Sequence, residues 1–227
     1  MWDLLAIYLI SVVSVALIFV YMKLTQPKEE ERKLRIGLFG GTFDPFTEAH
    51  QAIVDKVLEL GLVDVVTILP TIVTYHRNGK KPWLDETLKS AVIGCFTTRS
   101  PYHGKISIDC IEMGMARCGA LTDEQIRNWR FINTIERLEE DYKDIPVEFY
   151  MIIGTDSLKN LKTWHRWEDI VSKVKIIAVE GRNGETVDTD IVYTPVRIDE
   201  KYSSMSSSEI RSKFSNLSDY LKSVNKN

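Results

Sequence analysis

The sequence lacks the residue patterns of several common functional classes. Its three cysteines, Cys95, Cys110 and Cys118, form no CxxC pair, so we predict neither a disulfide framework nor a cysteine-based zinc site, only thiols in a reducing compartment. Its four histidines show no HExxH spacing, and we predict no metal site built by the protein itself. The formal net charge is −3, which provides no basic field for nucleic acid, so no nucleic-acid partner is predicted.

Two familiar phosphate-binding signatures are also missing. The chain has neither the GK[ST] ending of a Walker loop nor a GxGxxG fingerprint. With 44% hydrophobic and 27% charged residues among 227, it nevertheless has the composition and length of a folded globular domain. An anionic ligand would therefore be bound by local helix dipoles and a few basic side chains.

The N-terminal segment has a different composition from the rest. Residues 4–22 read LLAIYLISVVSVALIFVYM and contain no charge; as a helix they would span about 28 Å, close to the hydrocarbon thickness of a bilayer. Asp3 precedes this run, and basic residues follow it at Lys23, Lys28, Arg32, Lys33 and Arg35, the reverse of a secretory signal.

This charge pattern predicts a single-pass membrane anchor at residues 1–24, a charged linker at 25–33 and a folded domain at 34–227 on the cytoplasmic side. The alternative is a buried helix of a soluble domain, which would have to be apolar on every face, and such helices are uncommon.

Beyond the linker, strand and helix patterns alternate. We expect strands at residues 34–39, 63–69, 105–109, 147–153, 174–179 and 191–196. We expect helices at residues 48–60, 84–97, 123–141 and 206–221, and a polar turn at 181–185. The alternation predicts an α/β fold, a Rossmann-like parallel sheet with helices on both faces. Ligands bind such sheets beyond the carboxyl ends of the strands.

The segment between the first strand and the first helix is rich in glycine. Residues 40–50 read GGTFDPFTEAH, and two glycines allow the backbone to turn tightly and approach a ligand. Thr47 can cap the helix, whose free amides favour a phosphate. His50 lies three residues later on the same helix face, so both side chains can contact one anion. The simpler alternatives are a plain strand–helix turn and a packed histidine.

A second polar segment follows a later strand. Residues 152–158 read IIGTDSL; Gly154 permits a close backbone approach, and Asp156 can accept hydrogen bonds from ribose hydroxyls. Trp164 offers a flat face for a heteroaromatic ring, with an added attraction if that ring is a pyridinium. Alternatively, Trp164 and Trp167 are hydrophobic anchors of a short helix.

A third segment, residues 205–211, reads MSSSEIR. Ser206 and Glu209 have capping-box spacing, so a plain helix start is one interpretation. The same geometry suits phosphate, because Ser207, Ser208 and the free helix amides can bind phosphate oxygens and Arg211 adds a forked cationic donor.

These segments resemble a known family. GGTFDPFTEAH is similar to the G-[GST]-F-D-P-x-[HT]-x-G-H motif of the (T/H)xGH nucleotidyltransferase superfamily and differs at Ala49. The second segment, with Trp164 and Trp167, resembles I-I-G-A-D-x-L-x-x-L-x-x-W-x-x-W of the nicotinate/nicotinamide mononucleotide adenylyltransferases, and the third resembles I-S-S-T-x-I-R. The resemblance covers residues from about 34 to 214.

The resemblance implies adenylyl transfer from ATP to nicotinate or nicotinamide mononucleotide. The products would be deamido-NAD or NAD and pyrophosphate, and Mg²⁺ would be carried on ATP. The catalytic residues would be His50, Thr47 and Arg211; ATP and its phosphates would contact Gly40, Gly41, Thr42, Phe43, Gly154, Asp156, Ser207 and Ser208; and the mononucleotide would contact Trp164 and Thr134.

The departures from the family pattern concern base recognition. The family's P-P-H-K loop appears here as TYHR at 74–77, its Y-T-x-D-T-L as RFINTI at 130–135, and residues 114–122 resemble an insertion. The alternatives are a related transferase with another phosphorylated acceptor and a non-catalytic nucleotide-binding module at a membrane, although the retained pair of His50 and Arg211 favours turnover. The sequence leaves open the choice between nicotinate and nicotinamide, and whether the protein is a homo-oligomer.

Overall fold

The computed structural model describes residues 32–71, 82–112, 114, 122–180, 187–202, 205–214 and 216–224. The chain divides after Arg32 into two units, and the sheet and its helices belong to the unit Lys33–Asn227. The expected membrane segment at residues 4–22 lies outside the described residues, as do the expected turn at 181–185, His76 and Arg77. Within the described ranges no helix is long and apolar enough to cross a bilayer.

The described residues form one six-stranded sheet in the order β3-β2-β1-β4-β5-β6, and each neighbouring pair runs parallel. The strands are β1 (Leu34–Gly41), β2 (Val65–Pro70), β3 (Ile106–Ile108), β4 (Val147–Gly154), β5 (Val174–Val179) and β6 (Thr194–Val196). The strand order reverses at β1, which pairs with β2 on one side and β4 on the other. The predicted Rossmann-like parallel sheet is confirmed, and β1 and β4 border its switch point.

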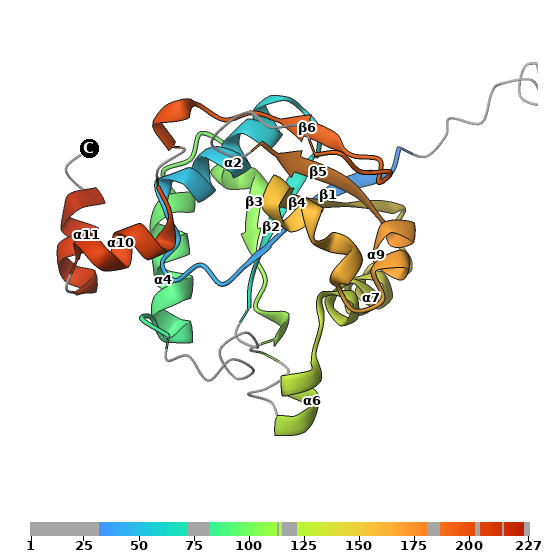
Figure 1. Cartoon of the computed structure of the whole chain (residues 1–227), viewed down its shortest axis with the longest axis horizontal. Helices are drawn as coiled ribbons and strands as arrows, with labels where there is room; N and C mark the ends of the chain where they lie inside the picture. The colour runs from blue at the N-terminus through green and yellow to red at the C-terminus, as the bar shows by residue number, and fades with distance from the viewer. Residues whose placement is uncertain are drawn as a thin grey trace, which may run out of the picture. The chain divides into compact units, whose positions relative to one another are not determined.

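Helices cover both faces of this sheet (Figure 1). The helices are α2 (Glu48–Glu59), α4 (Glu86–Thr97), α6 (Asp123–Asn128), α7 (Phe131–Asp141), α8 (Thr155–Lys159), α9 (Trp167–Lys173), α10 (Ser207–Lys213) and α11 (Leu217–Val224). Short 3₁₀ turns lie at η1 (His103–Lys105), η2 (Leu161–Thr163) and η3 (Glu200–Tyr202).

Two separate hydrophobic cores result, one on each face. Alternation along β4 divides them, because Ile152 packs with α2 and α4 on one face, whereas Met151 and Ile153 pack with α7, α8 and α9 on the other. The helices α10 and α11 join the first core, where Tyr220 is 3% exposed. The two-faced arrangement predicted from the alternating pattern is therefore confirmed.

Three expected elements differ in detail from the structure. The helix expected at 123–141 is broken at Trp129 and Arg130, whose backbones leave the helical conformation. The break is stabilised because the Arg130 amide donates to Asn133 Oδ1 at 2.9 Å and starts α7 anew. The helix expected at 206–221 is similarly divided into α10 and α11 at Phe214. The strand expected from residue 191 begins only at Thr194.

Candidate functional site

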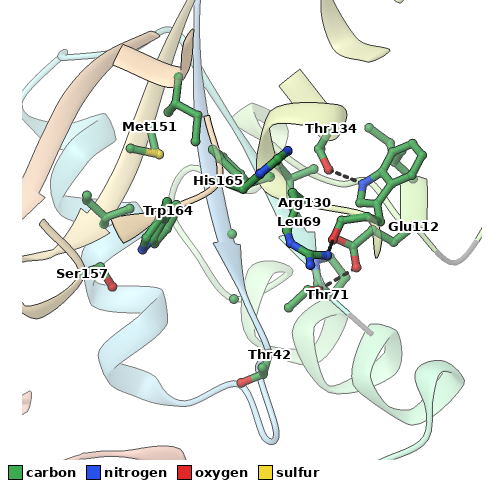
Figure 2. A pocket seen from close by; sticks show the side chains of 18 of the residues that line it. Thr42, Leu69, Thr71, Glu112, Arg130, Thr134, Met151, Ser157, Trp164 and His165 are labelled. Carbon is green, nitrogen blue, oxygen red and sulfur yellow. Dashed lines mark hydrogen bonds between the residues drawn. The ribbon is translucent and has the colours of Figure 1, made fainter. Parts of the chain in front are cut away.

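A pocket of about 800 Å³ opens at the carboxyl ends of β1, β2 and β4. Its volume is in the range that holds a nucleotide-sized ligand. It brings together five of the residues predicted from the sequence, namely Gly40, Gly41, Thr42, Thr134 and Trp164. In Figure 2, Trp164 and His165 lie on one side, while Thr134, Arg130, Glu112 and Thr71 lie opposite them.

The aromatic side of the pocket is formed by Trp164 and Phe131. Their rings meet edge to face, with centroids 6.2 Å apart and planes at 79°. Trp164 is half-buried and remains accessible to the pocket. Trp167 does not line it, and Lys162 Nζ lies 5.6 Å from its ring centroid. The structure therefore separates the two tryptophans, and only Trp164 is placed to stack on a bound ring.

The polar side contains residues that sequence reasoning missed. Thr71 Oγ1 donates to Glu112 Oε2 at 2.6 Å, and Trp129 Nε1 donates to Thr134 Oγ1 at 2.9 Å. Asp109 also lines the pocket, and burial raises the pKa of its carboxyl. Thr71 and Asp109 each follow a strand of a parallel sheet, a signal that could have identified them. Trp129 gave no such signal because it was expected inside a helix.

The turn after β1 requires glycine at one position. A Cβ on Gly41 would lie 2.8 Å from the ring of Phe43, so no larger residue fits without displacing that ring. Phe43 itself has φ of 44° and is 3% exposed, packed between Phe39 and Phe46. The side chain of Phe43, expected at the ATP site, is thus part of the core.

His50 is fixed by the residue that caps its own helix. The Thr47 amide donates to His50 Nδ1 at 3.0 Å, and Thr47 Oγ1 lies 2.9 Å from the same nitrogen. Because Nδ1 accepts a hydrogen bond, the hydrogen of the neutral ring is assigned to Nε2. Thr47 is 1% exposed, so in this conformation its hydroxyl serves the cap.

Three phenylalanine rings surround the imidazole of His50. The centroids of Phe39, Phe43 and Phe46 lie 6.1, 5.2 and 5.2 Å from its own. This desolvation lowers the pKa of His50 to about 4. His50 is consequently neutral at pH 7 and offers one hydrogen-bond donor, Nε2–H.

The segment between β1 and α2 is also bound from the C-terminal helices. Ser207 Oγ donates to the Pro45 carbonyl at 2.8 Å, and Arg211 Nη1 donates to the Asp44 carbonyl. Arg211 Nη2 donates to Ser208 Oγ at 2.9 Å. The third sequence segment therefore lies against the first, and its predicted phosphate-binding groups bond to the protein in this structure.

The remaining predicted residues lie at the end of β4. Gly154 is exposed, and a Cβ built there would meet nothing within 4 Å, so space for a close ligand remains above it. Asp156 is exposed in the first turn of α8. In the described part of the chain the pocket lining excludes Phe43, Thr47, His50, Gly154, Asp156, Ser207, Ser208 and Arg211.

No cluster of three or more His, Cys, Asp or Glu side chains that could hold a metal ion occurs in the ranges described above. The prediction that Mg²⁺ is carried on ATP stays a prediction.

Comparison with known proteins gives a consistent family assignment. A family model for cytidylyltransferase-like proteins matches residues 38–213. A "probable nicotinate-nucleotide adenylyltransferase" of Fusobacterium nucleatum is 28% identical over 197 residues, which cover 85% of this chain and 94% of that protein. A protein of the same description from Solibacter usitatus is 28% identical over 181 residues, covering 78% and 86%.

Solved structures agree in fold. The nicotinic acid mononucleotide adenylyltransferase of Plasmodium falciparum complexed with APC aligns with a TM-score of 0.62 at 19% identity. The same enzyme complexed with NaAD aligns with a TM-score of 0.63 at 19% identity. Each alignment covers 79% of this chain and 83% of the other.

Proposed function

This chain belongs to the cytidylyltransferase-like family, and from that premise we propose that it transfers the adenylyl group of ATP to nicotinate or nicotinamide mononucleotide. The products are deamido-NAD or NAD and pyrophosphate, so the enzyme serves NAD biosynthesis. The names of its bacterial relatives support a pyridine mononucleotide as the acceptor.

The observation that carries this proposal is the fixed, neutral imidazole of His50. With Nδ1 held by the Thr47 amide, the ring presents Nε2–H near the start of α2, where free amides already favour an anion. A donor held in place before the reaction stabilises charge that develops on phosphate oxygens. We assign His50 to the α- and β-phosphates of ATP. Thr47 fixes its ring in the structure, and its contact with phosphate stays a prediction.

The chemistry needs no protein base. The second pKa of a phosphate monoester is about 6, so the mononucleotide phosphate is already a nucleophile at neutral pH. One of its oxygens forms a bond to the α-phosphorus of ATP while the bond from that phosphorus to the β-phosphate bridge breaks, and pyrophosphate leaves. The protein aligns the two groups and neutralises charge.

Arg211 is proposed to serve the pyrophosphate end. Its guanidinium already spans the Asp44 carbonyl and Ser208 Oγ, which places a permanent positive charge beside the segment that precedes α2. Ser207 and Ser208 add hydroxyls at the start of α10. ATP is proposed to bind as its Mg²⁺ complex, because Mg²⁺ keeps phosphate oxygens and waters as ligands more readily than protein groups.

The pocket is proposed to bind the acceptor. A pyridinium ring stacked on Trp164 would gain both dispersion and the attraction of a cation for an indole face. The Gly40–Gly41 turn at the pocket edge would meet the phosphates of ATP where they face the acceptor, and Gly154 with Asp156, which lie outside the pocket lining, would meet the ribose of ATP. Thr134 lies at the opposite wall, beside the broken helix that replaces the family's Y-T-x-D-T-L.

We also propose that residues 4–22 anchor the enzyme in a membrane, with the domain on the cytoplasmic side. The support is in the sequence: 19 residues without charge, followed by basic residues. An ATP-consuming domain suits that side of the membrane.

The test is direct assay of the purified protein. With Mg²⁺, ATP and each mononucleotide in turn, we expect pyrophosphate and a dinucleotide in equal amounts, with phosphopantetheine as a control acceptor. His50→Ala should lower turnover by roughly 10²-fold or more. His50→Gln provides a matched control for folding, because Thr-x-x-Gln keeps a capping box and should lose turnover without loss of the helix start.

If phosphopantetheine were the one acceptor that supports turnover, the proposed acceptor would be wrong, but the proposed reaction, adenylyl transfer, would still hold. ATP binding without product from any acceptor would favour a non-catalytic nucleotide-binding module. Native turnover in His50→Ala would remove His50 from the catalytic assignment.

A further inference from the structure

Tyr220 lies outside the three sequence segments yet bonds directly to the segment that precedes α2. Its hydroxyl donates to the Phe46 carbonyl at 2.9 Å, a contact between residues 174 positions apart. Tyr220 is 3% exposed, and its ring packs on Phe214 with centroids 5.5 Å apart. A buried hydroxyl with a single carbonyl partner is a specific contact, since a plain hydrophobic residue would fill the same space.

The carbonyl that Tyr220 binds belongs to the same peptide group as the amide that holds His50. The Phe46–Thr47 peptide accepts from Tyr220 through its oxygen and donates to His50 Nδ1 through its nitrogen, at 3.0 Å. A hydrogen bond accepted by a peptide oxygen polarises the peptide and strengthens the bond donated by its N–H. The three groups therefore form one hydrogen-bonded chain from α11 to the imidazole.

The same contact also fixes the packing beneath the imidazole. Phe46 is fully buried, and its ring lies 5.2 Å from that of His50 and 5.7 Å from that of Phe96. Holding the Phe46 carbonyl thus holds the ring on which His50 rests. Neighbouring carbonyls of the same segment are bound by Ser207 and Arg211, but those two are already assigned to phosphate.

We propose that Tyr220 is a positioning residue for adenylyl transfer, which acts on His50 through the Phe46–Thr47 peptide group. This role rests on the proposed function, in which His50 contacts the phosphates of ATP. Tyr220 itself touches no substrate. It strengthens the hydrogen bond that the Thr47 amide donates to His50 Nδ1, so that the ring hydrogen stays on Nε2 and the Nε2–H bond keeps one direction.

The test compares Tyr220→Phe with Ser223→Ala. Tyr220→Phe removes the donor and keeps the ring, so the core remains filled. Ser223→Ala also deletes one hydroxyl of α11, but that hydroxyl donates to the Tyr220 carbonyl at 2.6 Å, within the helix. Both variants are assayed with Mg-ATP and mononucleotide well below their melting temperatures, and the nitrogen resonances of His50 are recorded in ¹⁵N-labelled protein.

We expect kcat to fall by about tenfold in Tyr220→Phe, since small misplacements of a catalytic group are costly, with a smaller change in the KM of the mononucleotide. His50 should populate the Nδ1–H tautomer in that variant, and Ser223→Ala should match the wild type in both measurements. A lower melting temperature together with native kcat and a native His50 signal would make Tyr220 purely structural and overturn the proposal.

The spectroscopic measurement separates this inference from the proposed function. If the wild-type protein forms no dinucleotide, adenylyl transfer is wrong, whereas a tautomer change confined to Tyr220→Phe still establishes the control of His50 by Tyr220. Unchanged His50 resonances in Tyr220→Phe would refute that control whatever the substrate.

Discussion

Acidification should destabilise the protein through His50. In the unfolded chain its pKa is 6.5, and in the folded protein burial among three phenylalanine rings lowers the pKa to about 4. A group with a depressed folded pKa stays neutral in the native state while the unfolded state binds a proton. The stability it contributes is complete above pH 6.5, is lost progressively as the pH falls, and is fully lost below about pH 4.

The magnitude follows from the width of that window. Each pKa unit corresponds to about 1.36 kcal/mol, so at pH 5, about 1.5 units below the unfolded value, the loss is about 2 kcal/mol. Such a loss is a large fraction of the stability of an ordinary domain. Asp109, whose pKa is raised by burial, changes the stability in the opposite direction as the pH falls, so a variant that lacks only the imidazole is needed to isolate the contribution of His50.

The assay is urea unfolding of the wild type and of His50→Gln at both pH values. The glutamine cannot titrate, and it keeps the capping-box spacing from Thr47. Between pH 7.5 and pH 5 the free energy of unfolding of the variant should therefore fall by about 2 kcal/mol less than that of the wild type. Equal pH dependence in the two proteins would contradict the desolvated, neutral state of the partly buried His50. A His50 titration midpoint near 6.5 in an NMR experiment would refute it as well.

Three further predictions concern the remaining parts of the site. Arg211→Lys should lower turnover, because an ammonium cannot bond both the Asp44 carbonyl and Ser208 Oγ as the guanidinium fork does; unchanged ATP affinity and turnover would place Arg211 on an idle helix face. Trp164→Ala should raise the KM of the mononucleotide more than that of ATP, with a loss of binding free energy on the order of 1–3 kcal/mol if stacking is the contact. Equal effects on both substrates, together with a lowered melting temperature, would make Trp164 a packing anchor. Removal of residues 1–33 should release a soluble, active domain, while the full-length protein resists carbonate extraction from membranes; an unfolded truncation would mean that residues 4–22 belong to the core.

The motifs were readable from the sequence because local chemistry specifies them. Gly41 is required by the ring of Phe43 only two residues away, and the cap formed by Thr47 and His50 lies within one helical turn. Such short-range contacts can be recognised as a motif of neighbouring residues in the sequence. The alternation of strand and helix likewise predicted the parallel sheet, since buried strands and amphipathic helices differ in their hydrophobic period.

The polar side of the pocket could not be predicted in the same way. Trp129 and Arg130 fitted the periodicity of one long helix, but the side chains of Asn133 and Thr134 bond to them and the helix breaks there. Thr71 and Glu112 meet across 41 positions of sequence. No local pattern signals such a contact, because it depends on how β2 and β3 are placed in the sheet.

The sequence by itself determined the fold class, the glycine-rich and serine-rich segments and the family, because each of these depends on residues close together in the chain. Only the tertiary structure decided which of those residues share a pocket, that Phe43 packs inside, and that Tyr220 reaches the peptide group that holds His50. The physical reason is that a hydrogen bond between residues 46 and 220 acts over about 3 Å, whereas the chain that joins them spans the whole sheet.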